Sequence, residues 1–229
     1  MALRRRGEQE GQFHISHDPG DSEASDLVEA AWLELLVDGL TFDCLGLEPG
    51  PALRLAEPRH RFEFAHDIEA GLEAIAIVPG PHLAGAGNSL PVVRTMVRLA
   101  AELAYNSSDL LGVFWQPSQC VIGKKYFTSI ASQWLSGGAF PALGLSGIAA
   151  QVDGALRSDG LAFFTGQEIE VEASLASNKV KASQLIVRLV DVLAGSEPLK
   201  ESQEIMGIDG RPLVLTPSGD GSIVRVFAQ

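Results

Sequence analysis

The chain has 229 residues, 46% of them hydrophobic and 20% charged, so it is long enough and apolar enough to bury a core and is not a disordered protein. Its 17 Lys and Arg against 29 Asp and Glu give a formal net charge of −12, which repels phosphate backbones and argues against a nucleic-acid partner. No apolar run reaches the roughly 18 residues that span a bilayer, and no apolar segment follows the basic N-terminus, so we expect a soluble cytoplasmic protein with no membrane partner.

Residues 1–24 form a polar N-terminal segment without apolar periodicity. Such a segment cannot repay the entropy of ordering, so we predict a mobile tail followed by a single domain over 25–229. The segment holds His14-x-x-His17-Asp18, a spacing found in metal sites. Metal ligands need rigid surroundings that hold them in place, which a mobile tail lacks. We therefore expect no metal and no cofactor.

The first helix is predicted over 25–39. Ser25 and Asp26 favour a helix start, and Gly39 favours its end. Between them, apolar residues recur at helical spacing: Leu27, Val28, Ala31, Trp32, Leu35 and Leu36. Short segments typical of strands follow at 41–47, 52–57, 61–66 and 74–78, with proline-containing turns among them.

The third of these strands carries two histidines. Alternation along 59–67 places His60, Phe62, Phe64 and His66 on one face of the strand. These side chains either line a pocket, with His66 as an acid–base candidate, or the histidines end a strand whose middle is core. A second acid–base candidate, His82, lies in the loop after the next strand.

That loop, residues 79–89, precedes a helix predicted over 90–104, an order that nucleotide-binding proteins use to hold phosphate. Ala86 stands where a P-loop needs its lysine, and Leu90 replaces the third glycine of the dinucleotide pattern. We therefore expect a connection that binds no ATP, GTP, NAD or FAD, in which two glycines allow a sharp turn. The free N–H groups at the helix start leave one ligand-binding hypothesis, a weak anion site at Gly85, Gly87, Asn88 and Ser89.

The second half of the chain alternates groups of strands with single helices. We predict helices over 124–136 and 178–194, and strands over 111–115, 120–123, 142–152, 161–166, 168–173, 212–217 and 222–228, with turns at 153–160 and 218–221. Glu168, Glu170 and Glu172 alternate with apolar residues along one strand. They form either the solvated face of an outer strand or a row that binds a cation or a basic partner.

Several short motifs together resemble a known family. They are Pro79-Gly80-Pro81 after a strand, Phe114-Trp115-Gln116-Pro117 on a later strand, and the run from Phe163 to Glu172 (FFTGQEIEVE) before a helix. In this order they resemble bacterial domain-of-unknown-function family 4261 over roughly residues 73–195. The resemblance implies an α+β bacterial domain, and it carries over no catalytic residue because the family has no assigned activity.

The sequence thus predicts an α+β fold, a single domain with mainly antiparallel sheet covered by about four helices. Cys44 and Cys120 either form a disulfide or stay reduced, as a cytosolic protein favours. For function, the absence of nucleophile and phosphate motifs favours a non-catalytic domain that binds a protein partner or a small ligand. The alternative is a small-molecule hydrolase or transferase with its site near the 79–89 loop, in which a deep pocket joins His66, His82 and a carboxylate.

Overall fold

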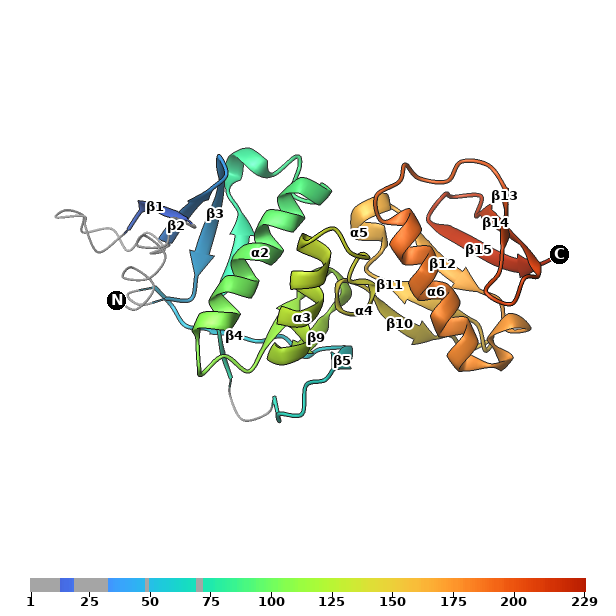
Figure 1. Cartoon of the computed structure of the whole chain (residues 1–229), viewed down its shortest axis with the longest axis horizontal. Helices are drawn as coiled ribbons and strands as arrows, with labels where there is room; N and C mark the ends of the chain where they lie inside the picture. The colour runs from blue at the N-terminus through green and yellow to red at the C-terminus, as the bar shows by residue number, and fades with distance from the viewer. Residues whose placement is uncertain (1–12, 19–32, 48–49, 69–71) are drawn as a thin grey trace. The chain divides into compact units, whose positions relative to one another are not determined.

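A computed structural model describes residues 13–18, 33–47, 50–68 and 72–229 (Figure 1). They divide into two compact units. Unit 1 comprises Met1–Glu57 and His66–Asn106, and unit 2 comprises Pro58–Ala65 and Ser107–Gln229. The α+β class and the mainly antiparallel sheets are confirmed, whereas the extent of one domain over 25–229 stays a prediction. None of the described helices is long and apolar enough to cross a membrane.

Unit 1 is built on a four-stranded antiparallel sheet. Its strands are β1 (His14–His17), β2 (Leu33–Val37), β3 (Leu40–Leu45) and β7 (Ala76–Pro79), in the order β1-β2-β3-β7. Two short strands, β4 (Leu53–Arg54) and β6 (Glu73–Ala74), pair with each other. The helix α2 (Leu90–Asn106) lies along the sheet, and the 3-10 turn η2 (Pro81–Leu83) connects β7 to it (Figure 1).

The core of unit 1 lies between α2 and one face of this sheet. Strand residues alternate between buried and half-exposed, so every second side chain enters the core. The buried residues are Leu33, Leu35, Val37, Phe42 and Cys44 on the strands, and Val92, Val93, Met96, Val97 and Leu99 on α2. With Ala104, six residues of α2 are buried, as expected for an amphipathic helix.

Two predictions for the N-terminal region are wrong where the structure describes it. Residues 33–37 of the predicted helix form a strand, because Asp38 and Gly39 both adopt positive φ, 51° and 79°, and turn the chain into a hairpin with β3. The predicted tail contributes β1, and Phe13 beside it is 5% exposed. The remaining residues of these two predictions, 1–12 and 19–32, lie outside the described residues.

Unit 2 contains a six-stranded sheet in the order β10-β11-β12-β15-β14-β13. The strands are β10 (Gly147–Ala150), β11 (Leu156–Asp159), β12 (Glu168–Val171), β13 (Gln203–Met206), β14 (Pro212–Pro217) and β15 (Ile223–Ala228). All pairs are antiparallel except β12 with β15. The helix α6 (Lys179–Leu193) packs against β11 and β12 and buries Ala182, Leu185, Ile186, Leu189 and Val190.

A second, three-stranded sheet in unit 2 has the order β5-β9-β8, with β5 (His60–Phe62) parallel to β9 (Cys120–Gly123) and β8 (Gly112–Trp115) antiparallel to it. Around it lie η3 (Gln116–Ser118), α3 (Lys124–Leu135), α4 (Ala142–Leu145), α5 (Ala162–Thr165) and η4 (Leu175–Ser177). Five aromatic rings stack or meet edge to face beside this sheet: Trp115, Trp134, Phe140, Phe163 and Phe164. Residues 58–65 reach this sheet although the chain on both sides of them belongs to unit 1.

Several predictions for the second half need correction. The predicted strands at 142–152 and 161–166 contain the short helices α4 and α5, the predicted turn at 153–160 contains β11, and β13 was not predicted. The strand with the three glutamates is an interior strand, since β12 lies between β11 and β15. The interpretation as the face of an outer strand is therefore wrong. Cys44 and Cys120 are both free and buried, and burial raises the pKa of each thiol, to about 11 and about 12 respectively.

Candidate functional site

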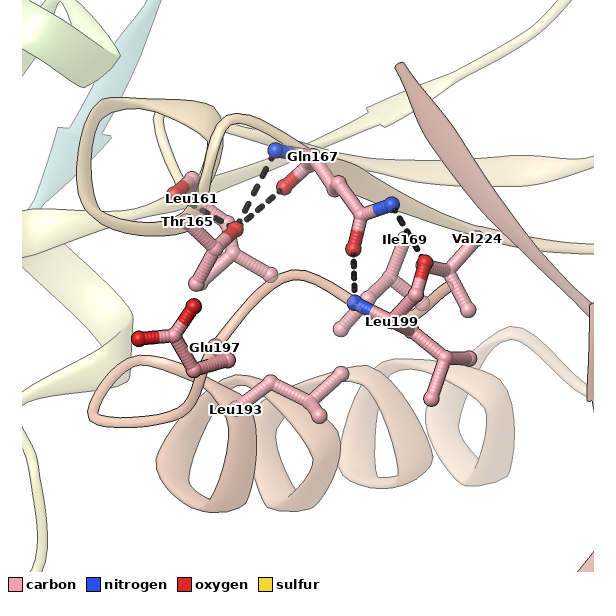
Figure 2. Close-up of a pocket in the computed structure, with 8 residues that line it drawn as sticks. All are labelled: Leu161, Thr165, Gln167, Ile169, Leu193, Glu197, Leu199 and Val224. Atoms are coloured by element: carbon pink, nitrogen blue, oxygen red, sulfur yellow. Dashed lines mark hydrogen bonds between the residues drawn. The ribbon is translucent and has the colours of Figure 1, made fainter. Parts of the chain in front are cut away.

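A pocket in unit 2 has a structural role (Figure 2). Apolar side chains line most of it: Leu161, Ile169, Leu193, Leu199 and Val224. Thr165, Gln167 and Glu197 are its polar residues, and the Gln167 amide donates to the carbonyls of Leu199 and Gly221 and accepts from the Leu199 N–H at 2.6 Å. With about 10 Å³ of free space, the pocket holds at most one water molecule. The Gln167 hydrogen bonds connect the segment after α6 to the sheet, and the pocket is too small for a ligand.

Glu168 also has a structural role. Its carboxylate accepts hydrogen bonds from the Ser158 hydroxyl and from the backbone N–H groups of Gly160, Leu161 and Ala162. Burial raises the pKa of this carboxyl, and the four hydrogen bonds lower it without cancelling the rise. The side chain thus holds the turn that leads from β11 into α5.

Two further groups of charged or titratable side chains in unit 2 also contact one another across the sheets. Glu170 accepts from Arg157 on β11 and lies 3.5 Å from the Arg225 Nε on β15. His60 Nε2 and Arg59 both lie 3.0 Å from one oxygen of Asp159. The predicted face shared by His60 and His66 does not form, because β5 ends at Phe62 and Glu63 adopts a φ of 49°.

Another group of ionisable side chains lies in unit 1, on the sheet face opposite α2, which we call the outer face. It carries His14, His17, Glu34, Thr41, Asp43 and Val78, with His82 beside them. The pairing register places His17, Glu34, Asp43 and Val78 in one row across all four strands. Residues paired in register point to the same side of a sheet, so this row is a single continuous surface.

A β-bulge at Ser16 brings both N-terminal histidines onto this face. His14 pairs with Leu36 and His17 with Glu34, so Ser16 is the extra residue in β1. Without the bulge, residues three positions apart would point to opposite faces of the strand. The Ser16 hydroxyl donates to the Glu34 carboxylate at 2.6 Å and fixes it within the row. The His14-x-x-His17 spacing therefore places both histidines on one face of the sheet, and not in a metal site within a tail.

Glu34 and Asp43 are two carboxylates directly opposite each other on neighbouring strands. Like charges in this position destabilise a sheet. Burial and, to a smaller extent, Glu34 raise the pKa of Asp43, while His82 and His17 act in the opposite direction. The Asp43 Oδ1 atom is buried and accepts no hydrogen bond in the described part of the chain. A buried acceptor left without a donor costs about 1–3 kcal/mol, so this arrangement is not the one that stability alone would favour.

His82 reaches the outer face because the turn after β7 folds closely over β3. The Gly80 N–H donates to the Thr41 carbonyl at 2.9 Å, and a Cβ on Gly80 would lie 2.5 Å from the Thr41 hydroxyl oxygen, so a larger residue would displace that hydroxyl. The Thr41 hydroxyl is 3.2 Å from His82 Nδ1 and orients the exposed imidazole.

The other predicted ligand residues form a turn that no observed feature links to a ligand. Gly85 and Asn88 are exposed, Gly87 and Ser89 are half-buried, and the Ser89 carbonyl accepts the Val93 N–H at the start of α2. Neither glycine has a positive φ, and a Cβ on either would meet no atom closer than 3.5 Å. The predicted turn is present at these glycines, but its backbone does not require glycine at either position. His66 is exposed and makes interactions of its own.

The sequence points to His82 as an acid–base candidate and to His14 and His17 by their spacing, but it does not place Glu34 and Asp43 beside them. Glu34 was placed on a helix, and the register that joins it to Asp43 and His17 depends on a hairpin that was not predicted. Chemically, the outer face offers two carboxylates to a positively charged group, with imidazoles around them that can exchange protons. Within the described residues, no three His, Cys, Asp or Glu side chains are arranged to hold a metal ion.

No family model matches the chain, and no curated protein or solved structure is significantly similar to it. The resemblance to domain-of-unknown-function family 4261 stays a prediction from the sequence.

Proposed function

We propose that this chain is a non-catalytic binding domain whose outer face takes a positively charged segment of a protein partner. The observation that carries this proposal is the pair of opposed carboxylates, Glu34 and Asp43, held side by side, with a buried Asp43 oxygen that accepts no hydrogen bond from any described residue. A lysine or arginine of the partner would neutralise the like-charge repulsion that the free domain contains.

The shape of the surface supports a macromolecule rather than a small ligand. The row crosses four strands, and its residues are half-buried or exposed on a sheet face. Small ligands are usually bound in concave sites that bury most of their surface, whereas flatter surfaces suit protein partners. A net charge of −12 steers a basic partner toward the protein and keeps nucleic acid away.

The enzyme alternative has less support from the geometry. It requires His66 and His82 to share an enclosed pocket with a carboxylate, and His82 instead lies exposed beside Asp43. General acid–base catalysis works best where water is excluded, whereas His82 is exposed and Asp43 is only half-buried. The proposed cellular setting is the bacterial cytoplasm, which keeps thiols such as the two free cysteines reduced.

A fluorescent octalysine peptide tests the proposal with the full chain at pH 7.5 and low salt. We expect the double variant Glu34→Gln, Asp43→Asn to bind the peptide at least tenfold more weakly than wild type. The matched control, Glu57→Gln with Glu201→Gln, removes the same charge from exposed positions outside the row and should stay within twofold of wild type. Equal loss in both double variants would mean that the peptide senses only net charge, and it would overturn the proposal.

A further inference from the structure

Three histidines share the outer face with the two carboxylates. His17 is the register partner of Glu34, His14 lies one row away opposite Leu36, and His82 is held by Thr41. The chain has only five histidines, so three of them gather on one sheet face. Imidazole is the side chain whose charge ordinarily changes between about pH 5 and pH 8.

From this arrangement we infer that the outer face reverses its charge in mildly acidic solution and so releases a basic partner. The inference rests on the proposed function, because it concerns the regulation of the same surface. The face holds two carboxylates, those of Glu34 and Asp43, and three imidazoles. Once the three imidazoles are protonated, the same face carries one net positive charge, which repels a lysine-rich segment.

When the pH falls, the titratable groups on the elements that form the face either gain positive charge or lose negative charge. β1 supplies His14 and His17, β2 supplies Glu34, β3 supplies Asp43 and η2 supplies His82, whereas β7 contributes the apolar Val78. The two nearest imidazoles already act on Asp43, since His82 and His17 lower the pKa of its carboxyl. Burial raises the pKa of Asp43, so acid also removes negative charge there earlier than from an ordinary aspartate.

A protonated imidazole and a lysine of the partner therefore compete for the same two carboxylates. Like charges a few ångströms apart repel each other in water, and more strongly near a protein surface. Charges that the histidines add next to Glu34 and Asp43 should thus weaken the binding of a cationic segment by at least tenfold. The chain as a whole stays anionic at pH 5.5 because its isoelectric point is about 4.8, but its net negative charge falls, so histidine variants must separate the local effect from this general loss of attraction.

The test measures octalysine affinity of the full chain at pH 7.5 and pH 5.5, at constant ionic strength. We expect wild type to lose at least tenfold in affinity over this range. The triple variant His14→Asn, His17→Asn, His82→Asn should lose less than threefold, because it keeps the carboxylates and lacks the imidazoles. His66→Asn, a histidine outside the face, is the matched control and should respond to pH as wild type does.

The possible outcomes separate this inference from the proposed function. If the peptide binds at pH 7.5 through Glu34 and Asp43 but wild type changes less than twofold at pH 5.5, the charge reversal is wrong and the binding surface stands. The same holds if the triple variant is as sensitive to pH as wild type. If the carboxylate variant binds octalysine as wild type does at pH 7.5, the surface itself is wrong, and the inference fails with it.

Discussion

Replacing Glu168 should reveal how strongly one carboxylate holds the turn between β11 and α5. In Glu168→Ala, three backbone N–H groups, those of Gly160, Leu161 and Ala162, lose their acceptor, as does the Ser158 hydroxyl. At about 1 kcal/mol for each backbone donor, the free energy of unfolding should fall by about 3 kcal/mol.

The Glu168→Gln variant should lose much less, about 1 kcal/mol at neutral pH. Its amide oxygen can still accept from Gly160 and Ala162, at 2.8 and 3.0 Å in the wild type, and the Ser158 hydroxyl can turn to accept from the new NH₂ group. Only the Leu161 N–H is left without an acceptor.

The pH dependence of this difference has a definite sign. Because the folded pKa of Glu168 is raised, its contribution to stability is fully present below the pKa of the unfolded chain, about 4.3. It is lost as pH rises through the folded value. Glutamine does not titrate, so wild type should gain stability relative to Glu168→Gln as pH falls from 7 to about 4.5.

Urea unfolding followed by circular dichroism measures these differences, with Glu201→Ala as an exposed control that should lie within about 0.5 kcal/mol of wild type. The reasoning fails if Glu168→Ala costs less than 1 kcal/mol or if alanine and glutamine cost the same. It also fails if the gap to glutamine shrinks at acidic pH.

Three further predictions concern packing. Gly87→Ala should leave the free energy of unfolding unchanged or raise it by about 0.4–1 kcal/mol. Gly123→Ala should prevent stable folding, because the new Cβ would lie 1.9 Å from a backbone oxygen. Thermal melts distinguish these two outcomes. Trp134→Ala should cost about 3–5 kcal/mol in urea unfolding, since the ring is 4% exposed, and a neutral result would contradict its place in the core. Deleting residues 1–18 should lower stability by about 2 kcal/mol or more, because Phe13 and β1 are lost; an unchanged melting temperature would favour the mobile-tail interpretation instead.

The long amphipathic helices were predictable because a sustained apolar stripe leaves little ambiguity. The structure places α2, α3 and α6 within about two residues of their predicted ends. The segment before Gly39 was ambiguous, since Leu35 and Leu36 fit a helical stripe as well as a strand. The Asp38-Gly39 pair was the available signal for a hairpin, because this dipeptide accepts positive φ at both positions.

The aromatic segment 161–166 was predicted as a strand from its β-propensity. It forms α5 because Gly160 and Gly166, at φ 101° and 78°, turn the chain at both ends and Glu168 accepts the first N–H groups. Contacts made by residues outside the segment here outweigh its β-propensity. The candidate site was hidden for a related reason. His17, Glu34 and Asp43 become neighbours only through a bulge and a strand register that local patterns do not determine.

Strand β5 has a consequence for how this chain can be made and divided. His60 of β5 pairs with Cys120 of β9, which is synthesised 60 residues later. During synthesis, β5 therefore stays unpaired with β9 until the remaining residues of unit 1 have been made. A cut after Asn106 would look like a clean boundary in the sequence, yet the C-terminal fragment would begin without β5 and expose one edge of β9 to other chains. The N-terminal fragment would keep a strand with nothing to pair with. Neither half of the gene therefore encodes a complete unit 2.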